Sequence, residues 1–136
     1  MTRRLLALLT VAALTLVACG GSDTDVAQKI ETVDPSRAAD IIADAPDGLV
    51  ILDVRTPAEF AQARLDGSIM VDYNAADFRD RVDELDKDVP YVMYCRSGNR
   101  SAGAREIMRE LGFTEVYEIG GGINDWVQSG LPVVSG

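Results

Sequence analysis

The sequence predicts a single α/β domain in which a sheet lies between two layers of helices. After residue 28, short apolar runs alternate with helical stretches, and the connections between them are short. The run Leu49–Val54 is almost continuously apolar, as in a strand buried on both faces of a parallel sheet. Of the 136 residues, the 118 that follow Ala18 suit one domain with a single core.

Residues 1–18 are typical of a lipoprotein signal peptide. Met1–Arg4 is cationic, Leu5–Val17 is apolar apart from two threonines, and small residues precede Cys19. This order indicates a secretory signal rather than a transmembrane helix. The Cys19 ending resembles a bacterial lipobox, which implies cleavage before Cys19 and lipid on its sulfur. We therefore expect an exported protein, anchored at the outer face of the cell membrane; an ordinary signal peptide with an incidental Cys19 is the alternative.

Residues 19–28 predict a flexible tether, because Gly20–Ala27 is small and polar, and residues 29–136 form the predicted domain. Cleavage removes Arg3 and Arg4, so 11 of the 13 basic residues remain against 22 acidic ones, a formal charge of −11. A nucleic acid is not an expected partner at that balance. The acidic domain would not be attracted to anionic lipid either, so the lipid anchor has to hold it at the membrane.

The first half of the domain carries two helix starts with capping signals. Asp34 and Pro35 match an N-cap and a first helical residue, and this helix is expected to run to about Ala45. Thr56–Glu59 matches a capping box with proline at the first helical position. The strands expected in this half are Ile30–Val33, Leu49–Val54 and Ile69–Val71.

The second half is expected to contain two helices next to glycines. Ser101–Leu111 is helical by its period and stops at Gly112. Gly122–Ser129 predicts a short helix carrying Trp126, which we expect in the core. Gly120–Gly122 is interpreted as a turn rather than a phosphate loop, because it lacks a lysine and the required spacing. The other expected elements are a helix over Ala75–Leu85 and strands over Tyr91–Tyr94 and Val116–Ile119.

Cys95 directly follows the apolar strand, and Arg100 and Ser101 open the next helix. The thiol therefore lies in a tight loop toward which main-chain N–H groups and the positive end of a helix dipole converge. Such a site favours the thiolate, which is the nucleophile. We expect the N–H groups of residues 96–101 to surround the sulfur, with Gly98 letting the loop curl.

Two arginines of this loop add positive potential and are candidates to contact an oxyanionic donor. We expect Arg100 to pair inward, whereas Arg96 is equally consistent with a solvated side chain. Histidine is absent, which excludes a Cys–His pair, a Ser–His–Asp triad and histidine-based metal sites. No metal or cofactor is expected. With Cys19 lipidated, Cys95 has no disulfide partner within the chain.

Asp53 and Arg55 follow a buried strand and are expected to line the same rim as Cys95, because strand carboxyl ends carry the sites of such sheets. A buried aspartate needs partners. We expect loop amides or Arg100 to bind Asp53, and Arg55 to pair with Glu59. These are supporting roles rather than chemical ones.

Three segments, taken together and in order, resemble the signatures of a single-domain rhodanese over roughly residues 30–134. They are Ile51–Phe60, Cys95–Ser101 and Gly121–Trp126. The resemblance implies a five-stranded, mainly parallel sheet and sulfurtransferase chemistry without a cofactor. Cys95 would take sulfane sulfur from a donor such as thiosulfate and pass it to a thiol or cyanide. The implied active-site loop is Arg96, Ser97, Gly98, Asn99, Arg100 and Ser101. A monomer is the default expectation for the oligomeric state.

Two features bear on rival functions. Rhodanese-fold phosphatases and arsenate reductases place five residues between cysteine and arginine, whereas four separate Cys95 from Arg100 here, and Tyr94 replaces a common histidine. Phosphoryl transfer is therefore the weaker hypothesis, and a sulfur carrier or a redox- or sulfide-sensing module is the alternative to an enzyme. Residues 63–68 also lack the histidine and proline of the usual rhodanese segment, so we expect a different rim shape.

Overall fold

The computed structural model describes residues 26–136. The predicted signal peptide, Cys19 and most of the predicted tether lie outside this range. Gln28, at the end of the predicted tether, donates side-chain hydrogen bonds to the carbonyls of Arg109 and Phe113 at 2.9 and 3.0 Å. The elements are β1 (Lys29–Val33), α1 (Pro35–Asp44), β2 (Val50–Asp53), α2 (Pro57–Gln62), β3 (Ile69–Met70), α3 (Phe78–Asp83), β4 (Pro90–Tyr94), α4 (Asn99–Glu110), β5 (Glu115–Ile119) and α5 (Gly122–Gln128).

The sheet has five strands in the order β1-β5-β4-β2-β3, and every neighbouring pair is parallel. This confirms the predicted fold class. All five residues of the central strand β4 are buried, which explains its apolar sequence. Asp53 pairs with Tyr94 in the β2–β4 register, so the ends of these two strands, and Cys95 after them, lie at one edge of the sheet.

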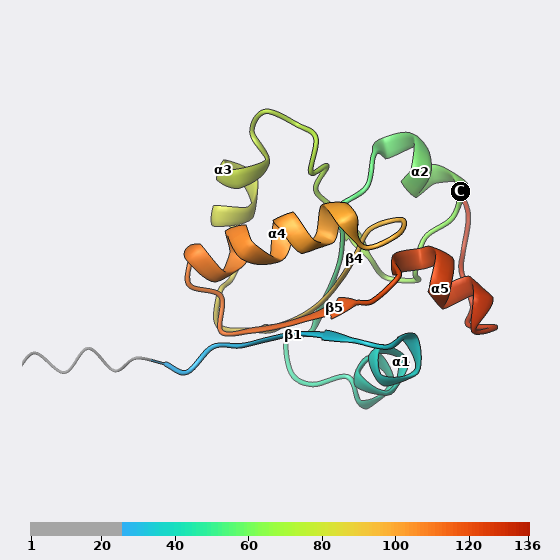
Figure 1. Cartoon of the computed structure of the whole chain (residues 1–136), viewed down its shortest axis with the longest axis horizontal. Coiled ribbons are helices and arrows are strands. Elements are labelled where there is room, and N and C mark those ends of the chain that lie inside the picture. The colour runs from blue at the N-terminus through green and yellow to red at the C-terminus, as the bar shows by residue number, and fades with distance from the viewer. Residues whose placement is uncertain (1–25) are drawn as a thin grey trace, which may run out of the picture.

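Helices cover both faces of the sheet (Figure 1). Each face has its own core of buried side chains. Phe78 of α3 and Met108 of α4 belong to the core on one face, and Ile41 of α1 and Trp126 of α5 to the core on the other. Trp126 is 5% exposed and donates its indole N–H to the carbonyl of Pro132 at 2.9 Å. The prediction that Trp126 is a core residue is thus confirmed.

The predicted helix caps are present. The Asp34 carboxylate accepts the N–H of Arg37 at 2.9 Å. In the capping box, the Thr56 hydroxyl accepts the N–H of Glu59 at 3.3 Å, and the Glu59 carboxylate accepts the N–H of Thr56 at 3.0 Å. These contacts are local in sequence, which is why the sequence predicts them well.

The helix predicted over Ala75–Leu85 is shorter in the structure, where α3 spans only Phe78–Asp83. The preceding residues form turns instead. The Asp72 carboxylate accepts the N–H of Asn74 at 2.9 Å, and the carbonyl of Ala75 accepts the N–H of Phe78 at 3.1 Å. Aspartate and asparagine favour such local bonds over helix.

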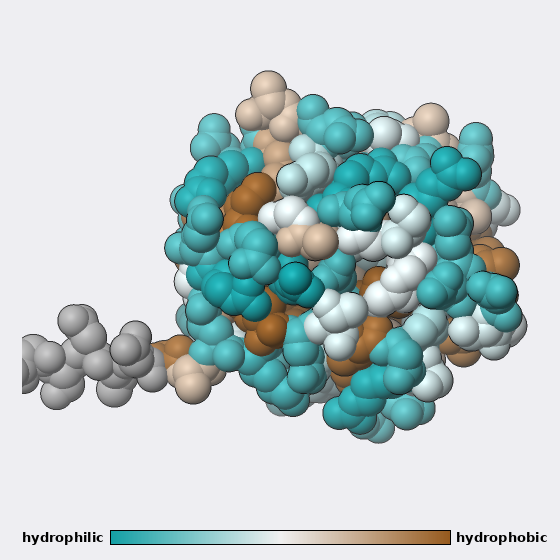
Figure 2. All heavy atoms as spheres, in the orientation of Figure 1, coloured by the Kyte–Doolittle hydropathy of each residue, from teal (hydrophilic) through white to brown (hydrophobic). Residues whose placement is uncertain are grey.

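Hydrophilic side chains cover most of the face seen in Figure 2, with small separate apolar patches between them. Among residues 26–136, the helices are all too short or too polar to span a bilayer.

Candidate active site

The loop between β4 and α4 turns the Cys95 sulfur toward main-chain amides, as the sequence predicts. Sγ accepts the N–H of Gly98 at 3.0 Å and lies 3.3 Å from the Ser101 hydroxyl, to which the thiol donates. Gly98 has φ of 103°, in the left-handed region that glycine adopts without strain. Gly98 is also the N-cap of α4, so the sulfur lies at the N-terminus of a twelve-residue helix.

The environment of the thiol lowers its pKa. Burial raises the pKa of Cys95, but hydrogen bonding with the Ser101 side chain and with the N–H groups of Ser101, Gly98 and Ser97 outweighs it. The net pKa is below its ordinary value, which favours the nucleophilic form.

Helix α5 binds the cysteine loop through two main-chain hydrogen bonds. The N–H of Ile123 donates to the carbonyl of Cys95 at 2.9 Å, and the N–H of Asn124 donates to the carbonyl of Arg96 at 3.1 Å. Since the C=O and N–H of one peptide point in opposite directions, binding the Arg96 carbonyl to α5 directs the N–H of Ser97 toward the sulfur. Gly122 permits this approach, because a Cβ there would lie 2.5 Å from the Cys95 carbonyl oxygen.

A buried carboxylate lies behind the Ser101 hydroxyl. Ser101 donates to Oε1 of Glu118 at 2.6 Å. The other oxygen, Oε2, accepts from Arg105 at 2.8 Å and from the Thr32 hydroxyl at 3.0 Å. Glu118 is 3% exposed. The sequence analysis missed Glu118, although a glutamate inside the apolar strand Val116–Ile119 is a signal for a partnered buried charge.

Of the two partners predicted for Asp53, a loop amide is confirmed and Arg100 is wrong. The N–H of Arg55 donates to the Asp53 carboxylate at 2.9 Å. The Arg55 guanidinium, rather than that of Arg100, donates to both carboxylate oxygens, with the shortest contact at 2.6 Å. Arg55 is 4% exposed, and it also donates to the carbonyl of Ala63 at 2.6 Å. Burial lowers the pKa of Arg55, but the ion pair with Asp53 raises it by more, so the Arg55 guanidinium stays charged.

The predicted pairing of Arg55 with Glu59 is also wrong, because the Arg55 guanidinium is bound to Asp53. Glu59 binds Arg100 instead, through two hydrogen bonds of 2.8 Å each. Hydrogen bonding from Arg100 lowers the pKa of Glu59 to about 2, against a smaller opposing effect of burial. Arg100 therefore joins α4 to α2 and does not offer a free charge to a donor.

Residues 63–68, the segment that departs from the usual rhodanese pattern, are bound by the side chains of Arg55 and Tyr94. Arg55 binds the carbonyl of Ala63, and the Tyr94 hydroxyl accepts the N–H of Leu65 at 3.1 Å. Burial raises the pKa of Tyr94 to about 12, so this phenol stays neutral. Leu65 is 1% exposed and fills the core beneath the turn.

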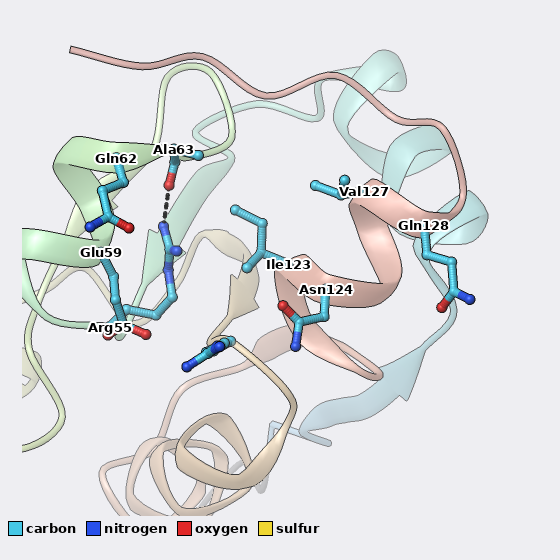
Figure 3. A pocket seen from close by; sticks show the side chains of 9 residues that line it. Arg55, Glu59, Gln62, Ala63, Ile123, Asn124, Val127 and Gln128 are labelled. Carbon is cyan, nitrogen blue, oxygen red and sulfur yellow. Dashed lines mark hydrogen bonds between the residues drawn. The ribbon is translucent and has the colours of Figure 1, made fainter.

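An open cleft of about 620 Å³ lies over this edge of the sheet (Figure 3). Figure 3 shows Arg55 and residues of α2 on one side and residues of α5 on the other. Arg96 lines the cleft and forms no ion pair among residues 26–136. The lining residues are Arg55, Glu59, Gln62, Ala63, Arg96, Ile123, Asn124, Val127 and Gln128.

Only part of the predicted rim lines the cleft. Arg55 and Arg96 do, whereas Cys95, Asp53 and Arg100 are not among its lining residues. Cys95 is 1% exposed and Asp53 is fully buried. The sulfur therefore lies beneath its loop, next to the cleft rather than open to it.

The comparisons with known proteins agree with this geometry. A family model described as "Rhodanese-like domain" matches residues 34–129. A protein named sulfurtransferase from Allochromatium vinosum is 34% identical over 106 residues, which cover 78% of this chain and 96% of that protein. Thiosulfate sulfurtransferase GlpE from Ectopseudomonas mendocina is 30% identical over 98 residues, 72% of this chain and 85% of that one.

A crystal structure of a rhodanese-related protein from Thermoplasma volcanium superimposes with a TM-score of 0.67 at 30% identity. The match covers 76% of this chain and 97% of that one. The family model thus spans both helical layers, the cysteine loop and every strand except β1. The relatives include proteins named for sulfur transfer. By fold and by sequence, this chain belongs to the rhodanese-like family.

Proposed function

We propose that this protein is a sulfurtransferase that moves sulfane sulfur from thiosulfate to a thiophilic acceptor through a Cys95 persulfide. The observation that carries the proposal is the contact of Sγ with the Gly98 N–H at 3.0 Å, at the N-terminus of α4. The same amides suit both anionic forms that the reaction needs, the thiolate and the persulfide. The thiosulfate sulfurtransferases among the relatives support this donor.

The reaction has two steps. The Cys95 thiolate attacks the outer sulfur of thiosulfate, a sulfur–sulfur bond forms at Sγ, and the bond to the sulfite group breaks with its electron pair. An acceptor thiolate or cyanide then attacks the outer sulfur of the persulfide and releases the Cys95 thiolate. Arg96 lines the cleft beside the loop and supplies positive charge for the departing sulfite.

Burial of the sulfur sets a condition on the first step. Because Cys95 is 1% exposed, a donor reaches Sγ only when the loop that covers it shifts. The carbonyls of Cys95 and Arg96 are fixed by α5, so the movement falls on Ser97 and Gly98. The opening of the loop to the donor is thus a separate step from sulfur transfer.

Mass spectrometry of the intact protein tests the proposal. After treatment with thiosulfate, the wild-type mass should rise by one sulfur atom, and cyanide should remove it with release of thiocyanate. Cys95→Ser should fold normally and gain no sulfur. A thiol that alkylates but never gains sulfur contradicts the proposal, and a protein that loads once without turnover with cyanide or thiols is a carrier instead.

For the cellular location, we propose export through residues 1–18 and a lipid anchor at Cys19. The support is the order of the cationic, apolar and small-residue segments before Cys19. Expression in a bacterial host with a fatty-acid analogue should label the wild-type protein at the membrane. Cys19→Ala should be unlabelled, and labelling of that variant contradicts the proposal.

A further inference from the structure

We propose that Glu118 is the proton acceptor for Cys95, and that the Ser101 hydroxyl relays the proton between them. This inference deepens the proposed function and rests on it for its biological use. Glu118 does not contact the sulfur donor. It acts on Cys95 only through Ser101, which carries the proton between the thiol and the carboxylate. The assignment gives a role to a buried carboxylate that sulfur transfer through main-chain amides alone does not need.

The hydrogen bonds form one directed chain. The thiol of Cys95 donates to Ser101 at 3.3 Å, and Ser101 donates to Oε1 of Glu118 at 2.6 Å. A serine hydroxyl carries one proton. The Gly98 carbonyl lies 3.2 Å from this hydroxyl, and the shorter contact at 2.6 Å holds the proton on the Glu118 side. All three residues are almost fully buried, at 1%, 0% and 3% exposure, so bulk water does not compete at these contacts.

The two oxygens of Glu118 have separate partners. Oε2 is bound by Arg105 from α4 and Thr32 from β1, which fix the carboxylate in place. Oε1 faces Ser101 and is the oxygen that receives the proton. Arg105 is 25% exposed in its side chain, so water solvates its charge when Glu118 becomes neutral. On the sulfur side, the Arg100 charge favours the thiolate.

The transfer is balanced. Both hydrogen bonds of the chain persist with their direction reversed, and only the longer contact of the Ser101 hydroxyl with the Gly98 carbonyl, at 3.2 Å, is given up. The thiol proton passes to Oγ of Ser101, the former hydroxyl proton passes to Oε1 of Glu118, and the electron pair stays on Sγ. Afterwards protonated Glu118 donates to Ser101, and Ser101 donates to the thiolate. The chain lacks histidine, the usual partner of a catalytic cysteine, and this path supplies the missing base.

The relay has a specific pH signature. A thiolate formed through the relay keeps its proton within the protein instead of releasing it to water, so the fraction of molecules in this form does not change with pH. The rate of thiol alkylation should therefore reach a plateau below the thiol pKa. Without a proton acceptor, the rate falls about tenfold for each unit of pH below the thiol pKa.

The experiment measures the alkylation rate of Cys95 by iodoacetamide against pH, with each protein scaled to its own rate at high pH. Wild type should show the plateau, and Glu118→Gln should lose it. If Glu118 only repels the thiolate, removing its charge should instead speed the reaction at low pH. The matched control is Glu110→Gln at the far end of α4, whose exposed carboxylate pairs with Arg79.

Ser101→Ala provides a second test if Glu118→Gln does not fold by circular dichroism, since it also cuts the relay. A wild type without the plateau, or a folded Glu118→Gln or Ser101→Ala that keeps it, overturns the inference. Alkylation needs no sulfur donor, so the two proposals fail separately. A plateau without sulfur loading rejects the proposed function, whereas loading without a plateau rejects the relay alone.

Discussion

Single residues around Cys95 are constrained by main-chain contacts more than by side-chain chemistry. The carbonyl of Cys95 is bound by Ile123, and its sulfur is bound by Gly98. The local geometry therefore depends on positions where a side chain does not fit. Gly122 is one of these, with φ of 62°, and a Cβ there would lie 2.5 Å from the main-chain carbonyl oxygen of Cys95.

Gly122→Ala should lower the free energy of unfolding by about 2–4 kcal/mol, from the strained φ and the clash together. It should also displace α5 from the loop and slow sulfur loading. Urea denaturation gives the first quantity and intact mass the second. Gly112→Ala is the control: it has a positive φ, but a Cβ there meets no atom within 4 Å. Equal effects of both variants on sulfur loading would contradict the argument.

Arg96 is the cleft arginine that forms no ion pair among the described residues. Arg96→Gln should raise the KM for thiosulfate about tenfold, in line with one lost charge-assisted contact. Alkylation of Cys95 by neutral iodoacetamide should change little. Steady-state kinetics check this, with exposed Arg81→Gln on α3 as control. An unchanged KM would place the donor elsewhere.

At the level of elements, the ion pair of Glu59 with Arg100 joins α2 to α4. The pKa of Glu59 is about 2 in the folded protein against an ordinary 4.5. A carboxyl with a lowered pKa stabilises the fold above its unfolded pKa, and this stabilisation is lost as the pH falls toward the folded pKa.

Glu59→Gln should therefore lower stability at neutral pH by about 1–2 kcal/mol, after allowance for solvent screening of a partly exposed pair. The difference from wild type should shrink as the pH falls from 4.5 to about 2. Thermal unfolding at several pH values measures it. Glu110→Gln, which breaks the exposed pair with Arg79, is the control and should change stability less. A difference independent of pH would contradict the ion-pair account.

Helices and strands that a short stretch of sequence specifies were predictable, whereas the contacts between these elements were not. The caps at Asp34 and Thr56 follow from adjacent residues, and the apolar β4 follows from its burial. The ion pairs were predicted with exchanged partners. Residues two apart lie on the same face of an extended chain, which explains why Asp53 binds Arg55. The Glu59–Arg100 pair spans 41 positions and depends on how α2 docks against α4.

For the whole molecule, the negative net charge repels an anionic sulfur donor at long range. The chain carries a formal charge of −9, and hydrophilic side chains dominate the surface seen in Figure 2. Thiosulfate is a dianion, so long-range repulsion slows its approach even though Arg96 attracts it at short range. Salt screens the long-range part first.

Raising the salt concentration from low to physiological should therefore increase kcat/KM for thiosulfate by about twofold. The alkylation rate with uncharged iodoacetamide should stay constant over the same range, which controls for changes in loop opening. Stopped-flow or steady-state kinetics at constant pH provide the measurement. A fall in kcat/KM with salt would indicate that local attraction by the cleft arginines dominates the encounter.

The parallel sheet also gives the domain a direction. Lys29 starts β1 at the amino-terminal edge, and Cys95 follows β4 at the opposite one. A strand of five residues separates these edges by about 16 Å. A restraint on the polypeptide upstream of residue 26 would therefore act at the edge of the sheet opposite the cysteine loop.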